Sequence, residues 1–181
     1  MILQTRKPAF PLNEFIENLV YYDGLEPPHT LDRFLPDGNT EFIIELNENT
    51  QFIYNNETLT EIQACRHAWV SGVRTRPITI PSGRGSRMLI VAFKKGKAYP
   101  FYPLPMSEIA DLVVNADLIF GLDILRLREQ LLAAPSVEHM FLLVEKFLLR
   151  QAGDALPVDI TSRCVTYAIS SIKNKPDRQR R

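Results

Sequence analysis

Glu41 is the residue of this chain whose type and setting most directly suggest chemistry. It opens an apolar segment, Glu-Phe-Ile-Ile-Glu-Leu, so its carboxylate is expected inside the fold. A buried carboxylate needs a cationic or hydrogen-bonding partner. Arg74 and Arg76 are available in a segment that has no acidic residue. A structural ion pair and contact with a bound ligand are both open as roles for these three residues.

Aromatic side chains supply a second set of candidates. Trp69 stands in the apolar segment Ala-Trp-Val, and Tyr99, Phe101 and Tyr102 form a cluster further on. Ligand sites are mostly apolar with a few polar anchors, so these rings could line a pocket. Core filling is the alternative role for most of them. The candidate ligand-binding set is Glu41, Trp69, Arg74, Arg76 and Tyr102.

The sequence lacks the residue patterns that metal binding or nucleophilic catalysis would require. His29, His67 and His139 are far apart in the sequence, whereas metal ligands must converge within about 2 Å of one ion. Cys65 and Cys164 are also far apart, and neither has neighbours that firmly indicate an activated thiolate. The chain has no G-x-S-x-G elbow, P-loop or dinucleotide-binding glycine pattern. We expect no catalytic residue, no metal, no cofactor and no enzyme activity.

The composition indicates an ordinary folded domain around these candidates. The 181 residues are 45% hydrophobic and 23% charged, which suits a chain that buries a core. No apolar stretch approaches the roughly 20 residues of a spanning helix, and the first residues lack the pattern of a secretory signal. We therefore expect a cytoplasmic protein with no membrane partner.

The net charge of zero hides two blocks of opposite sign. Residues 1–64 include three basic and eleven acidic residues, whereas residues 65–107 include eight basic residues and no acidic one. Such blocks can recognise an anionic ligand or nucleic acid. Opposite charges that meet across a sheet are the stronger explanation. We expect the early acidic strands to pair or stack with the basic strands of the middle region.

Short apolar runs separated by turn residues predict a sandwich or small barrel in the first part of the chain. Before these runs, an apolar spacing over residues 12–19 predicts one short helical face. Residues 41–46 and 51–54 are expected to form a hairpin around a turn at 47–50. The remaining predicted strands cover residues 58–63, 68–71, 76–80 and 87–93.

Helical spacing follows the predicted strands. Ser107 can cap a short helix, and residues 122–133 predict a longer one. The clearest helix begins after the cap Ser136 and ends at Gly153. It is apolar on several sides, so it must be buried among neighbouring elements or against a second copy. A last helix is predicted after Asp159.

A run of motifs between Leu35 and Gly121 resembles the sensor region of one subfamily of bacterial AraC-type transcription regulators. The motifs are LPDG, WVSG, TRPITIPSG, VAFKKG and PLPMSEIADLVVNADLIFG, in that order. Residues that match the sensor pattern are Pro36, Asp37, Gly38, Glu41, Gly72, Thr75, Arg76, Pro77, Gly83, Phe93 and Gly96. Lys95 stands where that pattern usually has a proline, which could alter the local turn.

The resemblance implies an α+β protein with a cupin-like antiparallel β-barrel at residues 1–104 and a helical linker and dimerisation subdomain at 105–153. Residues 154–181 would start the connection to a DNA-binding unit with two helix-turn-helix motifs beyond Arg181. The candidate homodimer residues are Met140, Phe141, Val144, Phe147 and Leu148.

These expectations describe a ligand-sensing regulatory domain. A small-molecule effector in the barrel would change how the helices pack and so reposition the DNA-binding unit. The alternatives are a stand-alone cupin-like domain that binds a small molecule or a protein, or a cupin metalloenzyme.

Overall fold

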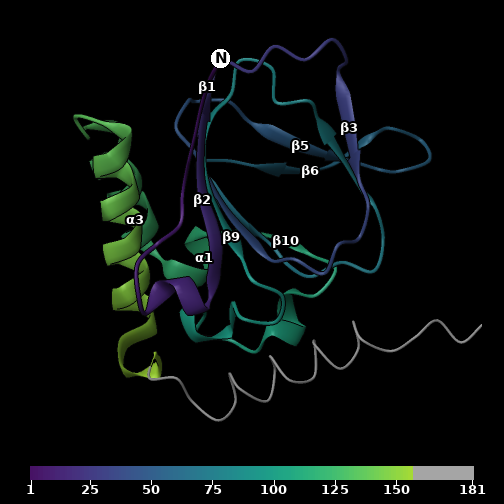
Figure 1. The fold of residues 1–181 in the computed structure, drawn as a ribbon. Coiled ribbons are helices and arrows are strands. Elements are labelled where there is room, and N and C mark those ends of the chain that lie inside the picture. Colours follow the sequence, from purple (N-terminus) through teal and green to yellow (C-terminus); the bar gives the residue numbers. More distant parts are fainter. Residues whose placement is uncertain (157–181) are drawn as a thin grey trace, which may run out of the picture.

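Ten strands form two antiparallel sheets in residues 1–156, which are the residues described by the computed structural model (Figure 1). The larger sheet has the strand order β1 (Ile2–Arg6), β2 (Ile16–Asp23), β9 (Arg87–Phe93), β4 (Glu41–Glu45), β7 (Ala68–Ser71) and β10 (Val113–Asn115). The smaller sheet has the order β3 (Leu31–Phe34), β8 (Ile78–Pro81), β5 (Gln51–Tyr54) and β6 (Glu61–Cys65).

The predicted α+β class is confirmed, whereas the predicted closed barrel is wrong. In this part of the chain the four edge strands β1, β10, β3 and β6 each pair with one neighbour only, so neither sheet closes on itself or on the other. The strands instead form two layers, and the helices follow them in the chain. The relationship to the cupins stays a prediction.

Strand β4 lies inside the larger sheet and separates two apolar cores. Its side chains alternate between the two faces, as they do in any strand. Phe42 and Ile44 belong to a core that is shared with the helices, while Ile43 belongs to a second core between the sheets. All three side chains are almost fully buried. Two buried faces explain why this segment is a continuous apolar run.

The helices follow the sheets in the chain, and α3 stands beside the larger sheet (Figure 1). They are α1 (Asp117–Phe120), α2 (Leu122–Leu132) and α3 (Val137–Ala152), with short 3₁₀ segments at Leu12–Glu14, Tyr99–Phe101, Met106–Ile109 and Gly153–Ala155. The predicted cap is confirmed, because Ser136 Oγ accepts a hydrogen bond from the backbone N–H of His139 at 3.2 Å. Within residues 1–156, no helix has both the length and the apolarity needed to cross a membrane.

Helix α3 uses its apolar face inside its own chain. The rings of Phe147 and Phe42 stack with centroids 6.1 Å apart, and Phe120 meets Phe147 edge-on at 5.4 Å. The residues predicted to form a dimer interface are therefore occupied within the core of the chain: Met140, Phe141, Val144, Phe147 and Leu148 are all buried. The reason is that the larger sheet offers this helix an apolar surface of its own. Leu142 and Leu149 are the large apolar residues that α3 exposes.

The helix predicted over residues 12–19 is wrong in most of its length. A 3₁₀ segment covers Leu12–Glu14, and strand β2 begins at Ile16. An irregular register lies between Ile16 and Asn18 against β9, and it adds one residue to the strand. Because of this bulge, Ile16 and Leu19 are both buried although they are three positions apart. The bulge thus imitates helical spacing.

The predicted hairpin of residues 41–54 is also wrong, although both of its strands exist. Strand β4 pairs with β9 and β7, so both of its edges are already taken. Strand β5 lies in the smaller sheet, where it pairs with β6 and β8. The turn at 47–50 therefore carries the chain from one sheet to the other.

Most other predicted elements agree with the structure. Strands 68–71 and 87–93 are confirmed as predicted, and the predicted strands 58–63 and 76–80 correspond to β6 and β8 with shifted ends. Strands β1, β3 and β10 were not predicted, and Ser107 lies in a 3₁₀ segment that it does not cap. The helix predicted after Asp159 and the thiol of Cys164 lie outside the described residues.

Candidate functional site

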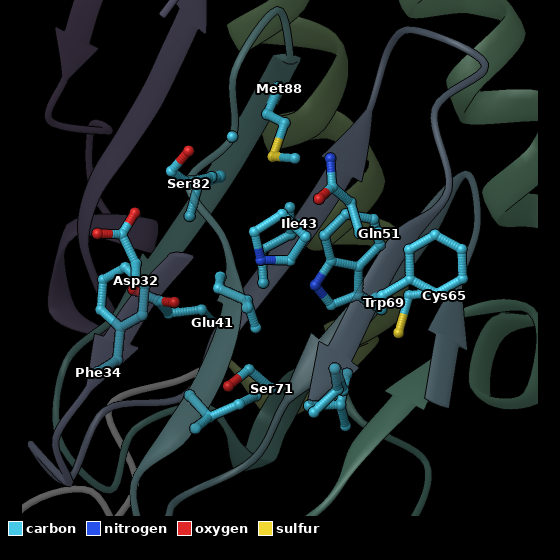
Figure 2. Close-up of a pocket in the computed structure, with 18 of the residues that line it drawn as sticks. Asp32, Phe34, Glu41, Ile43, Gln51, Cys65, Trp69, Ser71, Ser82 and Met88 are labelled. Carbon is cyan, nitrogen blue, oxygen red and sulfur yellow. The ribbon is translucent and has the colours of Figure 1, made fainter. Parts of the chain in front are cut away.

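A cavity of about 340 Å³ lies between the two sheets. Side chains from β4, β7 and β9 line it on one side, and side chains from β3, β5 and β8 line it on the other. Figure 2 shows some of these side chains, among them Asp32, Glu41 and Trp69. The volume falls within the roughly 300–1,000 Å³ that small-molecule sites occupy.

The apolar wall of the cavity is built by three neighbouring strands in register. Ile43 of β4 is directly opposite Trp69 of β7 and Ile90 of β9, and all three residues line the cavity. Ile53, Ile78 and Ile80 of the smaller sheet line it as well. Trp69 is the only tryptophan of the chain, so its indole reports on this cavity alone.

Glu41 supplies an unusual polar group to this lining. Among the residues that the structure describes, no hydrogen bond or ion pair reaches its carboxylate, and its side chain is half-buried. Burial raises the pKa of Glu41 above its usual 4.5, and the nearby charge of Asp37 raises it further, while Arg74 acts in the opposite direction. The protein therefore keeps a carboxylate in the cavity without compensating its charge through a direct contact.

Arg74 lies in the same lining but is not the ion-pair partner that the sequence suggested. Its Nη2 donates a hydrogen bond to Ser71 Oγ at 2.7 Å. Burial lowers the pKa of Arg74, and the carboxylates of Glu41, Asp111 and Asp37 oppose that shift. No ion pair joins Arg74 to Glu41 in the described part of the chain, so the two charges act on each other only at longer range.

The other carboxylates of the lining do have partners. Asp32 Oδ1 lies 2.8 Å from His29 Nε2. Asp37 accepts hydrogen bonds from the backbone N–H of Asn39 at 2.9 Å and from the Asn39 side chain. Glu41 thus differs from both, because its carboxylate is still open to a ligand.

Two predicted site residues lie away from the cavity. Arg76 is exposed and does not contribute to the lining. Tyr102 is buried in the helix-side core, where its ring contacts Phe93 at 5.9 Å and Phe120 at 5.6 Å. Placing Tyr102 in a pocket was wrong, because the chain after β9 turns to the helix side of the larger sheet. Within residues 1–156, its hydroxyl has no hydrogen-bond partner.

Several lining residues were not foreseen from the sequence. Tyr22 donates a hydrogen bond through its hydroxyl to Met88 Sδ at 2.8 Å, and Gln51 and Cys65 contribute from the smaller sheet. Burial raises the pKa of the Cys65 thiol to about 11, which leaves it protonated at neutral pH. The alternation of side chains along β9 places Met88 and Ile90 on the same face of the sheet. It did not reveal that this face lines a cavity.

A hydrogen-bond network with buried Glu45 and Arg128 at its centre connects the cavity to helix α2. Gln51, a lining residue, donates through Nε2 to Glu45 Oε2 at 3.2 Å. Arg128 of α2 donates through Nε to the backbone carbonyl of Glu45 and through Nη2 to that of Asn47, both at 2.8 Å. Arg128 also bonds to Glu48 Oε1 at 2.7 Å. The sequence showed Arg128 only as one charge in a helix.

A second hollow lies between α2 and the larger sheet, with His67, Asn115 and Asp117 among its lining residues. His67 Nε2 lies 3.8 Å from Glu48 Oε2. Within residues 1–156, no three histidine, cysteine or acidic side chains are grouped as a metal ion would require. The three histidines lie in separate places, with His29 in a loop and His139 on α3.

Fold and cavity together define an α+β protein that holds an internal space between two antiparallel sheets. Residues 4–115 match the family described as Domain of unknown function (DUF6597), and the chain belongs to this family. The matched residues run from β1 to β10 and so include every lining residue of the cavity. No curated protein matches the chain.

Proposed function

We propose that this chain is the ligand-sensing domain of an AraC-type transcription regulator. The observation that carries the proposal is the cavity between the sheets, with its apolar wall and the uncompensated carboxylate of Glu41. Ligand sites combine an apolar lining with a few polar anchors. A charge that is removed from water without a hydrogen-bond or ion-pair partner destabilises a folded protein, and a ligand that supplies such a partner reduces this cost.

Several of the motifs that resemble AraC-type sensors contribute lining residues to this cavity, which supports the proposal. The LPDG motif contributes Leu35 and Asp37 to the lining, and the WVSG motif contributes Trp69 and Ser71. The TRPITIPSG motif forms β8, which lies on the other side. The resemblance and the cavity therefore point to the same residues.

The network around Arg128 supports a role in signalling. A ligand that binds Gln51 or moves β4 acts on Glu45, whose backbone carbonyl is held by Arg128 of α2. Sensing requires that the ligand favours one packing of the helices over another. In the proposed mechanism the helices transmit this preference to a DNA-binding unit beyond Arg181, and a homodimer presents two such units to DNA.

A cavity-filling substitution tests the binding function directly. Ile80→Trp should fill the cavity, because Ile80 lines it. Ile62→Trp is the matched control, since Ile62 is 63% exposed on the same sheet and is not part of the lining. In a thermal-shift screen with a chemically mixed library, hits should raise the Tm of the wild type and of the control but not of Ile80→Trp. Equal shifts in all three proteins, or no hit at all, would contradict ligand binding in this cavity.

The regulatory output has a separate test. The gene should continue past the codon for Arg181 into roughly a hundred codons with two helix-turn-helix patterns, and the full-length product should bind DNA in a mobility-shift assay. A stop codon at that point would refute the AraC-type output. It would leave a stand-alone ligand-binding domain.

A further inference from the structure

We infer that the cavity binds a small apolar molecule with an ammonium or similar cationic group, and that Glu41 is its counter-ion. This inference depends on the proposed ligand-binding function and names the class of ligand. It follows from three properties of the cavity: the balance of its charges, the position of Glu41 and the apolar wall beside it.

The charges that line the cavity favour a cation. Asp32, Asp37 and Glu41 are the carboxylates of the lining, and Arg74 is its guanidinium. Arg74 is already surrounded by the charges of Glu41, Asp111 and Asp37, so it offers little attraction to an additional anion. Low-dielectric walls concentrate the field of such a group of charges inside a cleft. An anionic ligand would be repelled by this field, whereas a cation would be attracted.

The field of the carboxylates also acts on a second side chain. Burial raises the pKa of Tyr22, and the charges of Glu45, Asp32 and Glu41 raise it further, in that order. Tyr22 of β2 and Glu41 of β4 lie on opposite sides of β9, and both line the cavity, so the negative potential acts at more than one place in it. A cationic group therefore finds a favourable environment over more than one position.

Glu41 is placed to fix the position of the cationic group. Its neighbours in the lining already have other contacts: Asp32 with His29, Asp37 with Asn39, and Ser71 with Arg74. An ammonium group donates hydrogen bonds in several directions and would give the Glu41 carboxylate a direct partner. It would also favour the ionised carboxylate and so offset the effect of burial.

The wall next to Glu41 determines the rest of the ligand. Two residues along β4, Ile43 faces the same cavity, and it is flanked by Trp69 and Ile90. A compact hydrocarbon or aromatic body bound there would bury its surface against these side chains. The electron-rich indole of Trp69 also tolerates a nearby cation better than an aliphatic side chain does.

Three probes of similar size and different charge test the inference. They are 2-phenylethylamine, which is cationic at neutral pH, 2-phenylethanol, which is neutral, and phenylacetate, which is anionic. Binding is measured on the whole chain by calorimetry and by the fluorescence of Trp69. The variant is Glu41→Gln, and the control is Glu17→Gln, which removes the same charge from an exposed position on β2 outside the cavity.

The amine should bind the wild type and Glu17→Gln equally, and at least about tenfold more tightly than the alcohol does. Glu41→Gln should lose at least about tenfold in affinity for the amine and little for the alcohol. Binding of the amine to the wild type should weaken between pH 7.5 and pH 5, because protons then compete for Glu41, with Asp32, Asp37 and Arg74 as the other charges that line the site.

Three results would overturn the inference. These are equal or tighter binding of phenylacetate or phenylethanol, undiminished amine binding by Glu41→Gln, and amine affinity that is lost equally in Glu17→Gln. If none of the probes binds but library compounds bind the wild type and not Ile80→Trp, the ligand class is wrong and the binding function stands. If no compound of any kind binds, the proposed function fails as well.

Discussion

At the scale of single residues, the carboxylate of Glu41 should affect the stability of the fold as well as binding. Its pKa is raised in the folded chain, mainly by burial. The folded protein therefore holds this proton at pH values where the unfolded chain has already lost it. The contribution of Glu41 to the free energy of unfolding is therefore fully present below the pKa that Glu41 has in the unfolded chain. It is lost as the pH rises through the pKa that Glu41 has in the folded chain.

Replacing Glu41 by glutamine should remove this pH dependence. The free energy of unfolding of Glu41→Gln should exceed that of the wild type by an amount that is near zero at about pH 4, grows as the pH rises and becomes constant above the folded pKa. Urea unfolding between pH 4 and pH 8 measures the difference. Glu17→Gln should follow the wild type over the whole range. A constant difference between Glu41→Gln and the wild type would show that burial does not perturb Glu41.

Sequence reasoning placed three of its five candidate residues in the lining, and the reasons are physical. Glu41 and Trp69 lie within apolar strands, where alternation leaves only two faces to choose from. Arg74 follows β7 closely enough to stay near the cavity. Tyr102 was misplaced because it lies in a 3₁₀ and loop region, where no periodicity indicates which side of the sheet it meets.

At the scale of elements, Gly72 shows a close approach between the end of β7 and the segment before β10. The φ of Gly72 lies outside the left-handed region that favours glycine. A Cβ atom at this position would instead lie 1.8 Å from the backbone carbonyl oxygen of Ile109. The backbone N–H of Gly72 donates to the carbonyl of Leu112 at 3.0 Å. Glycine is thus required at this position because a larger side chain would clash with the neighbouring backbone, and not because of its φ angle.

Gly72→Ala should therefore destabilise the protein by about 3 kcal/mol or more, since two backbone segments would have to move apart. Gly85→Ala is the comparison, because its Cβ would meet nothing within 4 Å and only its φ of 66° opposes the change. We expect Gly85→Ala to lower the free energy of unfolding by about 1 kcal/mol. Chemical denaturation of both proteins gives the two values. A smaller loss for Gly72→Ala than for Gly85→Ala would disprove the close approach.

Many of the elements were predictable from the sequence, and two of the failures have one origin. Strands with regular alternation, such as 68–71 and 87–93, were found with correct ends. The bulge in β2 produced a helical spacing, and the partner of β5 could not be read from its short distance to β4. In both cases a contact between distant segments overrode the local pattern.

At the scale of the whole molecule, Arg128 joins the helices to the strands that line the cavity. Arg128→Met should lower the free energy of unfolding by about 2–4 kcal/mol, because the carbonyls of Glu45 and Asn47 lose their donors. Arg126→Met, in the same helix, should change it by no more than about 0.5 kcal/mol, since Arg126 is exposed and its ion pair with Asp123 lies at the surface. Equal effects of the two substitutions in urea unfolding would contradict this role of Arg128.

The strand order of the larger sheet has a consequence for how the chain folds during its synthesis. Strands β2 and β4 lie on either side of β9, and β4 also needs β7. During synthesis, which adds about 5–20 residues per second, β2 can pair with β1 but must wait for several seconds before residues 87–93 leave the ribosome. The apolar faces of β2 and β4 are exposed throughout that interval. We expect the nascent chain to depend on chaperones that shield early strands, and to form its larger sheet only when its middle strand has emerged.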